Sequence, residues 1–392
     1  MADNTQEGAQ TDCIRVLHFV STLSRGSGVM SVLMNYYRHI DRNKVQFDFL
    51  HFVACEDSYI EEIRALGGRI YCIDKPGSSF QSVKQLDLFF RLHAEEYTWL
   101  HNHEVYLTFL LRPIAKRYGL EKFIVHCHAT KYSDKTLHAV RNRILCLPIR
   151  FMKVDRFACS EAAGKFLYGE KMLKAGKVFI MHNAIDCEKF RFRPEVRERL
   201  RKEMGLEGKF VIGHVGRFER QKNHEFLIRV FVECQKYIKN CTLLLIGDGS
   251  RKNCIRSMSD LLGVTSQVYF LGYRKDISEL FQVIDVFVLP SLYEGLPVSC
   301  LEAQFSGINC FVSTNVTRET DIGGIEFLSL NISPQLWAKA ICENKNTYKN
   351  QEIINLRMGL SESIIRKSIK LGNEIQCAAL KLVDKYIEGL NS

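Results

Sequence analysis

Short apolar runs alternate along the chain with segments whose apolar residues return every three to four positions. The helical pattern is clearest at 29–40, where Val29, Val32, Tyr36 and Ile40 fall on one face. Continuous apolar runs separated by amphipathic helices are typical of a parallel sheet covered by helices. The strand-like runs are 14–20, 46–53, 69–73, 98–101 and 122–127, and then 209–215, 241–246, 267–271, 285–289 and 308–313. The pattern therefore predicts an α/β protein.

The alternation runs through twice, which predicts two doubly wound units. At roughly 150 residues per domain, 392 residues also suggest two or three domains. Ligands of open α/β sheets bind at the carboxyl ends of the strands, so two such sheets would present those ends across one cleft. The predicted division is a disordered tail at 1–12, a first Rossmann-like domain at 13–190, a charged linker at 191–208, a second Rossmann-like domain at 209–371, and a C-terminal helix at 372–392 that packs back on the first domain.

Composition narrows the class of protein. Hydrophobic residues make up 46% of the chain, which excludes wholesale disorder. The 14 cysteines are scattered without a Cys-x-x-Cys pair, as expected for reduced thiols in a cytosolic protein. The polar start lacks the basic and apolar regions of a signal peptide, and apolar stretches such as 281–290 fall short of the roughly 18 residues that span a bilayer. We expect a cytoplasmic protein that contacts membranes only peripherally.

The basic charge is concentrated in residues 111–180, which hold 15 Lys and Arg against 5 Asp and Glu. This excess equals the net charge of +10 of the whole chain, so the remainder is balanced. Solvated helix faces would explain the excess. A surface for anionic lipid headgroups or a phosphate-bearing acceptor would explain it equally well, and Arg141, Arg143 and Arg150 around the apolar ILCLPI favour a membrane surface. No nucleic-acid-binding motif is present, so nucleic acid is not an expected partner.

Residues 213–224 read GHVGRFERQKNH, at the end of a predicted strand. Gly216 allows the backbone to turn close to a ligand, and Arg217 and Lys222 flank the start of a helix for which Asn223 is a plausible N-cap. Two cations beside a helix N-terminus favour a diphosphate. Exposed cations near helix starts are also common, so this segment alone does not decide between a binding site and an ordinary surface.

Residues 294–302 read EGLPVSCLE and follow the strand predicted at 285–289. Glu294 falls in the loop at the carboxyl end of that strand, and Pro297 suits the first position of the next helix. Glu302 shares one helical face with Leu301 and Phe305, so it points inward, where a carboxylate needs a partner. Ribose hydroxyls or a neighbouring Arg would satisfy it, and so would a structural salt bridge to Arg217 or Lys222.

Two His-x-His pairs precede these motifs: His101 with His103, and His126 with His128. Residues i and i+2 of a strand share a face, so each pair could supply half of a metal site. Satisfied core histidines are the alternative. We expect no metal.

Taken together, GRFERQKNHEFLI, LLLIGDG, VYFLGYRKDISELF and EGLPVSCLEAQFSG, in this order and spacing, resemble the retaining glycosyltransferases of family 4, the glycosyl transferases group 1. The resemblance is strongest to bacterial enzymes that build capsular polysaccharides and exopolysaccharides. It covers nearly the whole chain and is densest over 209–316. It implies the GT-B fold, in which two Rossmann-like domains face a central cleft and the second holds a nucleotide-sugar donor. No cofactor is implied, because the nucleotide-sugar is itself the substrate.

The resemblance also implies roles for individual residues. Arg217 and Lys222 would hold the donor diphosphate and stabilise the leaving group without a metal, Glu302 would bind the ribose and Glu294 the sugar hydroxyls. His128 would be the active-site histidine near the donor sugar, and His103 would help to shape the acceptor pocket. Further donor contacts are expected from Gly26, Gly28 (the glycine nearer the helix), Gly216, Gly272, Tyr273, Gly295, Leu296, Pro297 and Val298. Where family members have Asn-Gly, this chain has Asn183-Ala184, a departure that concerns loop geometry.

The expected reaction is transfer of a sugar, with UDP as the expected nucleotide, to a lipid-linked or oligosaccharide acceptor, with retention of configuration. Same-face attack, in which the leaving phosphate oxygen helps to deprotonate the acceptor, is favoured, and a covalent Glu or Asp intermediate is the alternative. A sugar-nucleotide epimerase and a catalytically silent nucleotide-sugar-binding protein are the competing functions.

Overall fold

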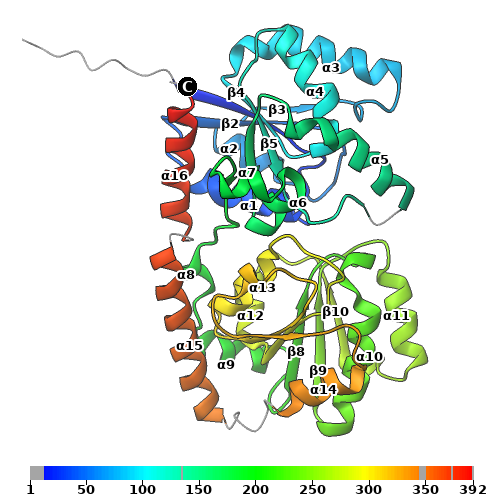
Figure 1. Cartoon of the computed structure of the whole chain (residues 1–392). Helices are drawn as coiled ribbons and strands as arrows, with labels where there is room; N and C mark the ends of the chain where they lie inside the picture. Colours follow the sequence, from blue (N-terminus) through cyan, green and yellow to red (C-terminus); the bar gives the residue numbers. More distant parts are fainter. Residues whose placement is uncertain (1–12, 134–135, 344–349, 372–373, 391–392) are drawn as a thin grey trace, which may run out of the picture.

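A computed structural model describes residues 13–133, 136–343, 350–371 and 374–390, and the tail predicted at 1–12 lies outside these residues. Two parallel sheets dominate the fold, one above the other in Figure 1. The first has the order β3-β2-β1-β4-β5-β6-β7 and consists of parallel strands. Its strands are β1 (Ile14–Phe19), β2 (Val45–His51), β3 (Ile70–Cys72), β4 (Trp99–Asn102), β5 (Phe123–Cys127), β6 (Asp155–Ala158) and β7 (Phe179–Ile180).

Helices cover both faces of this sheet. Leu17 and Phe19 of β1 pack into one apolar cluster with residues such as Leu86 and Leu111, and Val16 packs into another on the opposite face. Burial on both faces explains why these strands are continuous apolar runs. The helices of the first domain are α1 (Gly28–His39), α2 (Ile60–Ala65), α3 (Phe80–His93), α4 (Thr108–Arg117), α5 (Thr136–Cys146), α6 (Glu161–Tyr168) and α7 (Glu170–Lys174), with the 3₁₀ turns η1 (Ala94–Glu96), η2 (Val105–Leu107) and η3 (Leu147–Arg150).

The second sheet has the order β10-β9-β8-β11-β12-β13, again with parallel neighbours. Its strands are β8 (Phe210–Val215), β9 (Cys241–Ile246), β10 (Val268–Gly272), β11 (Val286–Leu289), β12 (Asn309–Ser313) and β13 (Ile325–Leu328). The helical elements around it are α8 (Cys187–Phe190), α9 (Pro194–Glu203), η4 (Arg220–Lys222), α10 (His224–Tyr237), α11 (Lys252–Leu261), η5 (Thr265–Gln267), α12 (Ile277–Val283), α13 (Val298–Phe305), η6 (Arg318–Thr320), α14 (Pro334–Glu343) and α15 (Asn350–Leu371). The prediction of two doubly wound units is confirmed.

The strand order reverses at the same place in both sheets. β1 lies between β2 and β4 in the first, and β8 lies between β9 and β11 in the second. At such a switch point the loops after the two central strands diverge, which leaves room for a ligand at their carboxyl ends. The loops that follow β8 and β11 contain the motifs at 213–224 and 294–302. The topology therefore brings together two motifs that lie about 80 residues apart.

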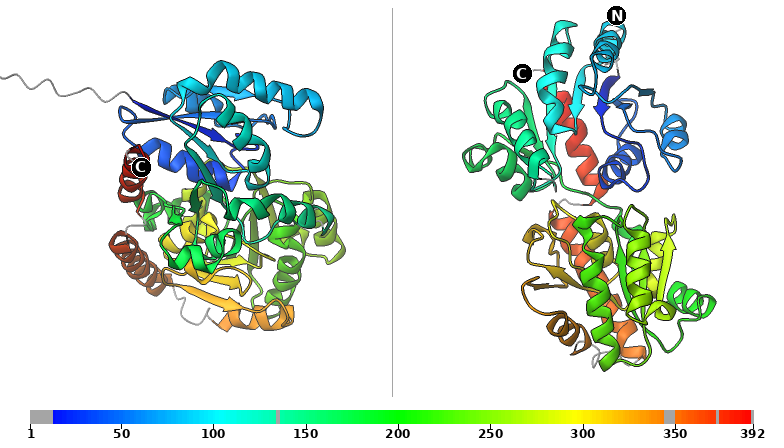
Figure 2. Two further views of the ribbon diagram at one scale, coloured as in Figure 1. Left: turned by 45° about the horizontal axis from the view of Figure 1, so that its top comes forward. Right: turned by 90° about the vertical axis from the view of Figure 1, so that its right-hand side faces the viewer.

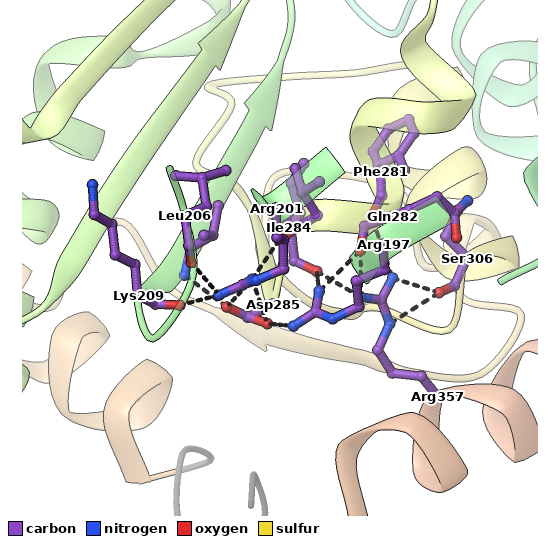
Figure 3. Close-up of polar contacts among 12 residues, drawn as sticks. Arg197, Arg201, Leu206, Lys209, Phe281, Gln282, Ile284, Asp285, Ser306 and Arg357 are labelled. Atoms are coloured by element: carbon purple, nitrogen blue, oxygen red, sulfur yellow. Dashed lines mark hydrogen bonds and ion pairs between the residues drawn. The ribbon is translucent and has the colours of Figure 1, made fainter. Parts of the chain in front are cut away.

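Residues 191–208 were predicted to be a linker. They contain the helix α9, which packs on the second domain. Arg197 of α9 is buried and forms an ion pair with the buried Asp285 at the start of β11. Arg201, one turn later, lies 3.2 Å from the other oxygen of Asp285. Figure 3 shows both guanidinium groups around this carboxylate. Two of the charges in this segment, those of Arg197 and Arg201, therefore belong to an internal network.

Arg357 of α15 extends the network. Its guanidinium group donates to the carbonyl oxygens of Ile284 (2.8 Å) and Ser306 (2.9 Å), and Figure 3 shows it between these two residues. Because α9, α15 and the β11 strand all meet at these groups, the network fixes the two helices to the sheet.

The last helix, α16 (Ile375–Glu388), continues the line of α15 but lies beside the first domain (Figures 1 and 2). It packs on α1, and its Tyr386 is fully buried. Trp99 Nε1 donates to the carbonyl oxygen of Tyr386 at 3.2 Å, and Lys122 donates to the carbonyl of Gly389. The polypeptide thus returns to the domain in which it began.

No described helix combines the length and the apolar content that a membrane span needs. All 14 cysteines are free thiols, and nine of them are buried. Their main structural role is therefore that of small apolar core residues.

Candidate active site

The loop after β8 positions two cations. Gly216 donates its backbone N–H to Ile246 O at 2.9 Å, and a Cβ at this glycine would lie 3.1 Å from Cδ and Cε of Lys222. The glycine thus leaves space for the lysine stem to cross the turn. Arg217 is exposed and its side chain makes no hydrogen bond or ion pair with the described residues. Asn223 precedes α10 with φ 55°, but its side chain donates to Pro290 O and does not cap the helix as predicted.

Lys222 and Glu294 form the centre of the site. Lys222 Nζ lies 2.7 Å from Glu294 Oε1, and the two side chains are only 14% and 9% exposed. Gln221 Nε2 donates to the other carboxylate oxygen at 3.1 Å. The salt bridge that the sequence suggested for Glu302 is therefore made by Glu294, which was expected to contact the sugar. The Coulomb attraction within an ion pair shielded from water in this way is stronger than within a surface pair, and the removal of both charges from water opposes it.

The loop from Glu294 to Leu296 is held by the first domain. Three consecutive carbonyl oxygens, those of Glu294, Gly295 and Leu296, accept hydrogen bonds from Thr130 (3.3 Å), Ser160 (3.4 Å) and Asn183 (2.5 Å), in that order. The carbonyl oxygens of the loop are thus occupied, whereas some of its backbone N–H groups are not. Those of Leu296 and Val298 donate no hydrogen bond to the described residues. Val298 begins α13, so these groups lie at a helix N-terminus, where backbone amides favour anions.

Gly295 lies in direct contact with the first domain, and a Cβ there would clash with the carbonyl oxygen of His128. We therefore expect Gly295→Ala to force the two domains apart and to lower activity at least tenfold, because misplacement by about 1 Å can cost as much as 10²-fold. Small-angle scattering should show a larger radius of gyration. Gly359→Ala is the matched control, because a Cβ at Gly359 meets nothing within 4 Å. An unchanged radius and rate for Gly295→Ala would contradict this interpretation.

Glu302 is half-buried on α13, with no side-chain hydrogen bond to the described residues. Burial raises the pKa of Glu302 to about 7, and the charge of Lys189 opposes the rise. Near neutral pH the group is therefore divided between a carboxylate that accepts hydrogen bonds and an acid that donates one. Either form can bind a hydroxyl-bearing ligand, because a hydroxyl both donates and accepts.

The loop after β10 lies near the same edge of the sheet. Gly272 has φ +66°, a left-handed conformation that favours glycine, and its carbonyl accepts from Gly247 N at 2.8 Å. Tyr273 is 38% exposed, and burial raises the pKa of its hydroxyl to about 12, with Tyr59 and Asp57 of the first domain contributing to the rise. Tyr273 therefore lies close to the first domain.

In the first domain, the loop after β1 leads into α1. Ser27 is the N-cap of this helix, Gly28 is its first residue, and a Cβ at Gly28 would meet nothing within 4 Å. The space around Gly26 is also open, apart from Ser24 Oγ at 3.5 Å. The helix start is thus unobstructed, and which of the two glycines approaches a donor stays a prediction.

The two His-x-His pairs come together because β4 and β5 are neighbours. His103 Nδ1 lies 2.8 Å from His128 Nε2, and His101 Nε2 lies 3.1 Å from His126 Nδ1. Their ring nitrogens come close enough to consider a metal, with His103, His126 and His128 forming one such group. The nitrogens of the close pairs, however, lie at hydrogen-bond distance from each other and are already used in pairing.

His103 and His128 border a cavity of about 150 Å³ in the first domain. Aromatic side chains, namely Tyr106, Tyr132 and Phe166, supply much of the wall, and Asn142 of α5 adds an amide. His128 also touches Gly295 through its backbone, so the cavity lies beside the loop that carries Glu294. The residues expected on the acceptor side and those expected on the donor side are therefore adjacent.

Several residues at this junction escaped the sequence analysis. Gln221 is one of them, and Glu319 of η6 is another. Glu319 accepts the backbone N–H groups of Glu161 (2.7 Å) and Ala162 (2.8 Å) at the start of α6 in the other domain. A carboxylate at a helix N-terminus is favoured by the helix dipole. No local pattern marks Glu319, because its partners belong to the other domain. Gln221 was missed because its partner Glu294 lies far along the chain in another loop of the same domain.

Comparison with known proteins identifies the family. Residues 196–322 match the family model of glycosyl transferases group 1. The Bacillus subtilis protein EpsF, whose name assigns it to the glycosyltransferases, is 34% identical over 83% of this chain and 86% of its own. A UDP-Gal:α-D-GlcNAc-diphosphoundecaprenol α-1,3-galactosyltransferase of Escherichia coli is 29% identical over 76% of this chain and 79% of its own.

Solved structures show the same architecture. Anabaena HepE, determined in complex with UDP and glucose, superposes with a TM-score of 0.75 at 16% identity, over 95% of this chain and 99% of its own. WaaG, a glycosyltransferase of lipopolysaccharide biosynthesis, gives a TM-score of 0.70 at 14% identity, over 95% and 99%. At these identities the likeness concerns the fold, which is the expected GT-B arrangement. The sequence relatives named above are transferases and give no support to the epimerase. The chain belongs to the group 1 glycosyltransferases.

Proposed function

We propose that the protein transfers a sugar from a nucleoside diphosphate sugar, with UDP as the nucleotide, to a lipid-linked or oligosaccharide acceptor during capsular or exopolysaccharide synthesis. The observation that carries the proposal is the shielded Lys222–Glu294 ion pair beside exposed Arg217, at the switch point of the second sheet. Anions bind at such loops, and acidic side chains suit sugar hydroxyls. The galactosyltransferase named above acts on a diphosphoundecaprenol-linked sugar, and HepE was solved with UDP, which supports this donor and this acceptor class.

The chemistry follows from where charge develops. The bond between the anomeric carbon and the diphosphate oxygen breaks, and the acceptor oxygen bonds to that carbon. We propose that attack occurs on the same face, so configuration is retained and the acceptor proton passes to the departing phosphate oxygen. Lys222 and Arg217 stabilise the negative charge that grows on the diphosphate, so no metal or other cofactor is part of the proposal. Glu294 holds sugar hydroxyls, and Glu302 holds the ribose.

The acceptor enters through the cavity beside His128 and His103. Its aromatic wall suits the apolar face of a sugar ring, and Lys131 at its edge also lies 4.8 Å from the ring of Tyr293, in the donor domain. An acceptor placed there would lie next to Gly295 and hence next to the sugar that Glu294 holds.

We propose that a membrane-binding surface of the protein lies next to this cavity. The exposed apolar residues of α5 and η3, together with Phe151 just after η3, recur at intervals of three and four, so they form one stripe. Exposed Arg141, Arg143 and Arg150 lie among them. Apolar side chains flanked by cations suit the boundary between acyl chains and anionic headgroups. The stripe consists of Leu137, Val140, Ile144, Leu147 and Phe151. We propose that it rests on the inner face of the plasma membrane and brings the lipid-linked acceptor to the site.

We expect the double variant Leu137→Ser/Phe151→Ser to bind vesicles of phosphatidylglycerol and phosphatidylcholine at least tenfold more weakly than the original chain. These side chains are 84% and 90% exposed, and burying one large apolar side chain contributes about 1.5–3 kcal/mol. Flotation measures the bound fraction. Leu261→Ser is the control, since Leu261 is 87% exposed but lies on α11 of the other domain. Equal binding of the double variant and the control would contradict the proposed surface.

The donor is tested by a panel of nucleotide sugars. A ligand that binds the folded state alone raises the melting temperature, so the true donor should give the largest increase, and it should be hydrolysed or transferred on incubation. UDP-sugars should exceed GDP- and ADP-sugars. A chain that binds no nucleotide sugar would be a silent member of the family, and an epimerised sugar recovered in the absence of acceptor would establish the alternative activity.

A further inference from the structure

Three histidines, two of them buried, form a line that ends at the cavity. His18 of β1 places Nδ1 3.0 Å from His103 Nε2, and His103 Nδ1 lies 2.8 Å from His128 Nε2. The rings of His18 and His103 are stacked, with centroids 5.3 Å apart. The first two are fully or nearly buried, whereas His128 is half-buried and borders the cavity. This line is separate from the neighbouring pair His101–His126, which ends on Tyr386 of α16.

All three imidazoles are neutral at pH 7. Burial lowers the pKa of His18 to about 3 and that of His128 to about 3, and it lowers the pKa of His103 well below its usual value. A neutral imidazole has one N–H and one bare nitrogen. Each of the two contacts in the line needs one donor and one acceptor, so the protons must all point the same way along it. Two arrangements remain, and they differ in the form of His128.

The inner end of the line decides between them. Nε2 of His18 is sealed from solvent and has no hydrogen-bond partner. The His18 ring packs against the rings of Phe47 and Phe49, with ring centroids 4.2 and 5.5 Å apart. If the protons pointed inward, this atom would be a buried N–H without an acceptor. If they point outward, it is a bare nitrogen. Orphaned buried donors are rarer in proteins than under-satisfied acceptors, and a ring face is a weak acceptor.

We propose that His18 and His103 are positioning residues that hold His128 as the neutral tautomer with its proton on Nδ1. His18 donates to His103, His103 donates to His128 Nε2, and His128 presents an N–H from Nδ1. This atom makes no hydrogen bond to the described residues and is absent from the sealed atoms of the site. It therefore serves as a fixed donor toward an oxygen of the bound substrate. The assignment of that oxygen to a sugar or phosphate rests on the proposed function, but the tautomer does not.

The tautomer can be measured without any substrate. In the full-length chain labelled with ¹⁵N-histidine, long-range ¹H–¹⁵N spectra distinguish a protonated ring nitrogen from a bare one, and His128→Gln assigns the signal. We expect a protonated Nδ1 on His128. In His103→Leu the donor to His128 Nε2 is lost, and the proton of His128 should move to Nε2. In His103→Gln an amide N–H can replace the donor, so the Nδ1 form should be restored. A His128 protonated on Nε2 in the original chain would overturn the proposal.

Activity supplies the second measurement. His103→Leu should lower kcat about tenfold with little change in KM for the donor, which corresponds to the loss of one hydrogen bond in the transition state. His103→Gln should recover most of it. His101→Gln measures the cost of altering an equally buried neighbour that does not contact His128 through a hydrogen bond. If the Gln variant at 103 were as impaired as the Leu variant, or if His101→Gln had the same effect, His103 would have a merely structural role.

The two hypotheses fail in different ways. If no nucleotide sugar is turned over but His128 carries its proton on Nδ1, the proposed function fails and the positioning line stands. If transfer occurs but the tautomer is the other one, the reverse holds. Metal analysis of the purified chain completes the test: one equivalent of zinc, lost in His103→Leu, would replace the hydrogen-bonded line by a metal site.

Discussion

Replacing Lys222 by alanine is expected to lower kcat by about 10²–10³-fold, the range found when one preorganised group that stabilises transition-state charge is removed. Lys222 is only 14% exposed and lies at the carboxyl end of β8, where the leaving diphosphate is proposed to bind. Water cannot easily replace a charge at a shielded position. Initial rates with the donor identified by the nucleotide-sugar panel measure the loss, and a melting curve checks that the variant is folded.

The matched control is Lys239→Ala, because Lys239 is exposed beyond the end of α10 and far along the chain from the loop. Glu294→Ala provides an independent arm, since it removes the partner of Lys222 and the proposed contact with the sugar hydroxyls together. Turnover close to that of the original chain in both Lys222→Ala and Glu294→Ala would refute the assigned site. If Lys239→Ala lowered turnover as well, the assay would respond to the removal of any positive charge and not to Lys222 in particular.

The second large effect concerns stability. Asp285→Ala is expected to lower the free energy of unfolding by about 3–5 kcal/mol, because it leaves Arg197 and Arg201 without the carboxylate they share. Asp285 also accepts the backbone N–H of Val211 at 2.7 Å, so β8 loses a contact with β11. At about 2–4 °C per kcal/mol for a domain of this size, the melting temperature should fall by roughly 6–20 °C. Calorimetry of the full chain measures it.

The same carboxylate predicts an acid-sensitive component. Burial raises the pKa of Asp285, but the charges of Arg197 and Arg201 outweigh burial and hold the pKa below its usual value. A lowered pKa in the folded state stabilises the fold above the unfolded pKa of about 3.9, and this contribution is lost as the pH falls through the folded value.

Asp276→Asn is the control. Its pair with Arg274 is exposed, so at most about 1 kcal/mol should be lost. A comparable loss in both variants would contradict the special role of Asp285.

Much of the fold could be predicted because strands buried on both faces carry an apolar signal that needs no context. β8, β9 and β12 were predicted to within one residue at each end. β6 was not, because DRFA opens with two charged residues, and β7 has only two residues. The edge strand β13 reads IEFL and is partly exposed. Such strands are defined by the neighbour with which they pair and not by their own composition.

The candidate site divides in the same way. Glycines and charged residues after a strand mark a turn at the sheet edge, so Gly216, Lys222 and Glu294 could be selected from sequence. Which carboxylate pairs with Lys222 could not, because that depends on how two loops meet in space. The helix within the segment predicted as a linker was missed for a related reason. Charge usually indicates solvent, and only the tertiary structure shows that Arg197 faces a buried aspartate.

The return of the chain to its first domain constrains how the two halves can move. Ile185, on the way out, forms an isolated parallel bridge with Glu374, on the way back. Ile185 and Glu374, which lie on the two connections between the domains, are therefore neighbours. With a single connection the two domains could rotate relative to each other in any direction. Two adjacent connections restrict this rotation to one axis. Opening and closing of the two domains would then be a rotation about this hinge axis, which would bring the facing loops back to the same contacts on each closure.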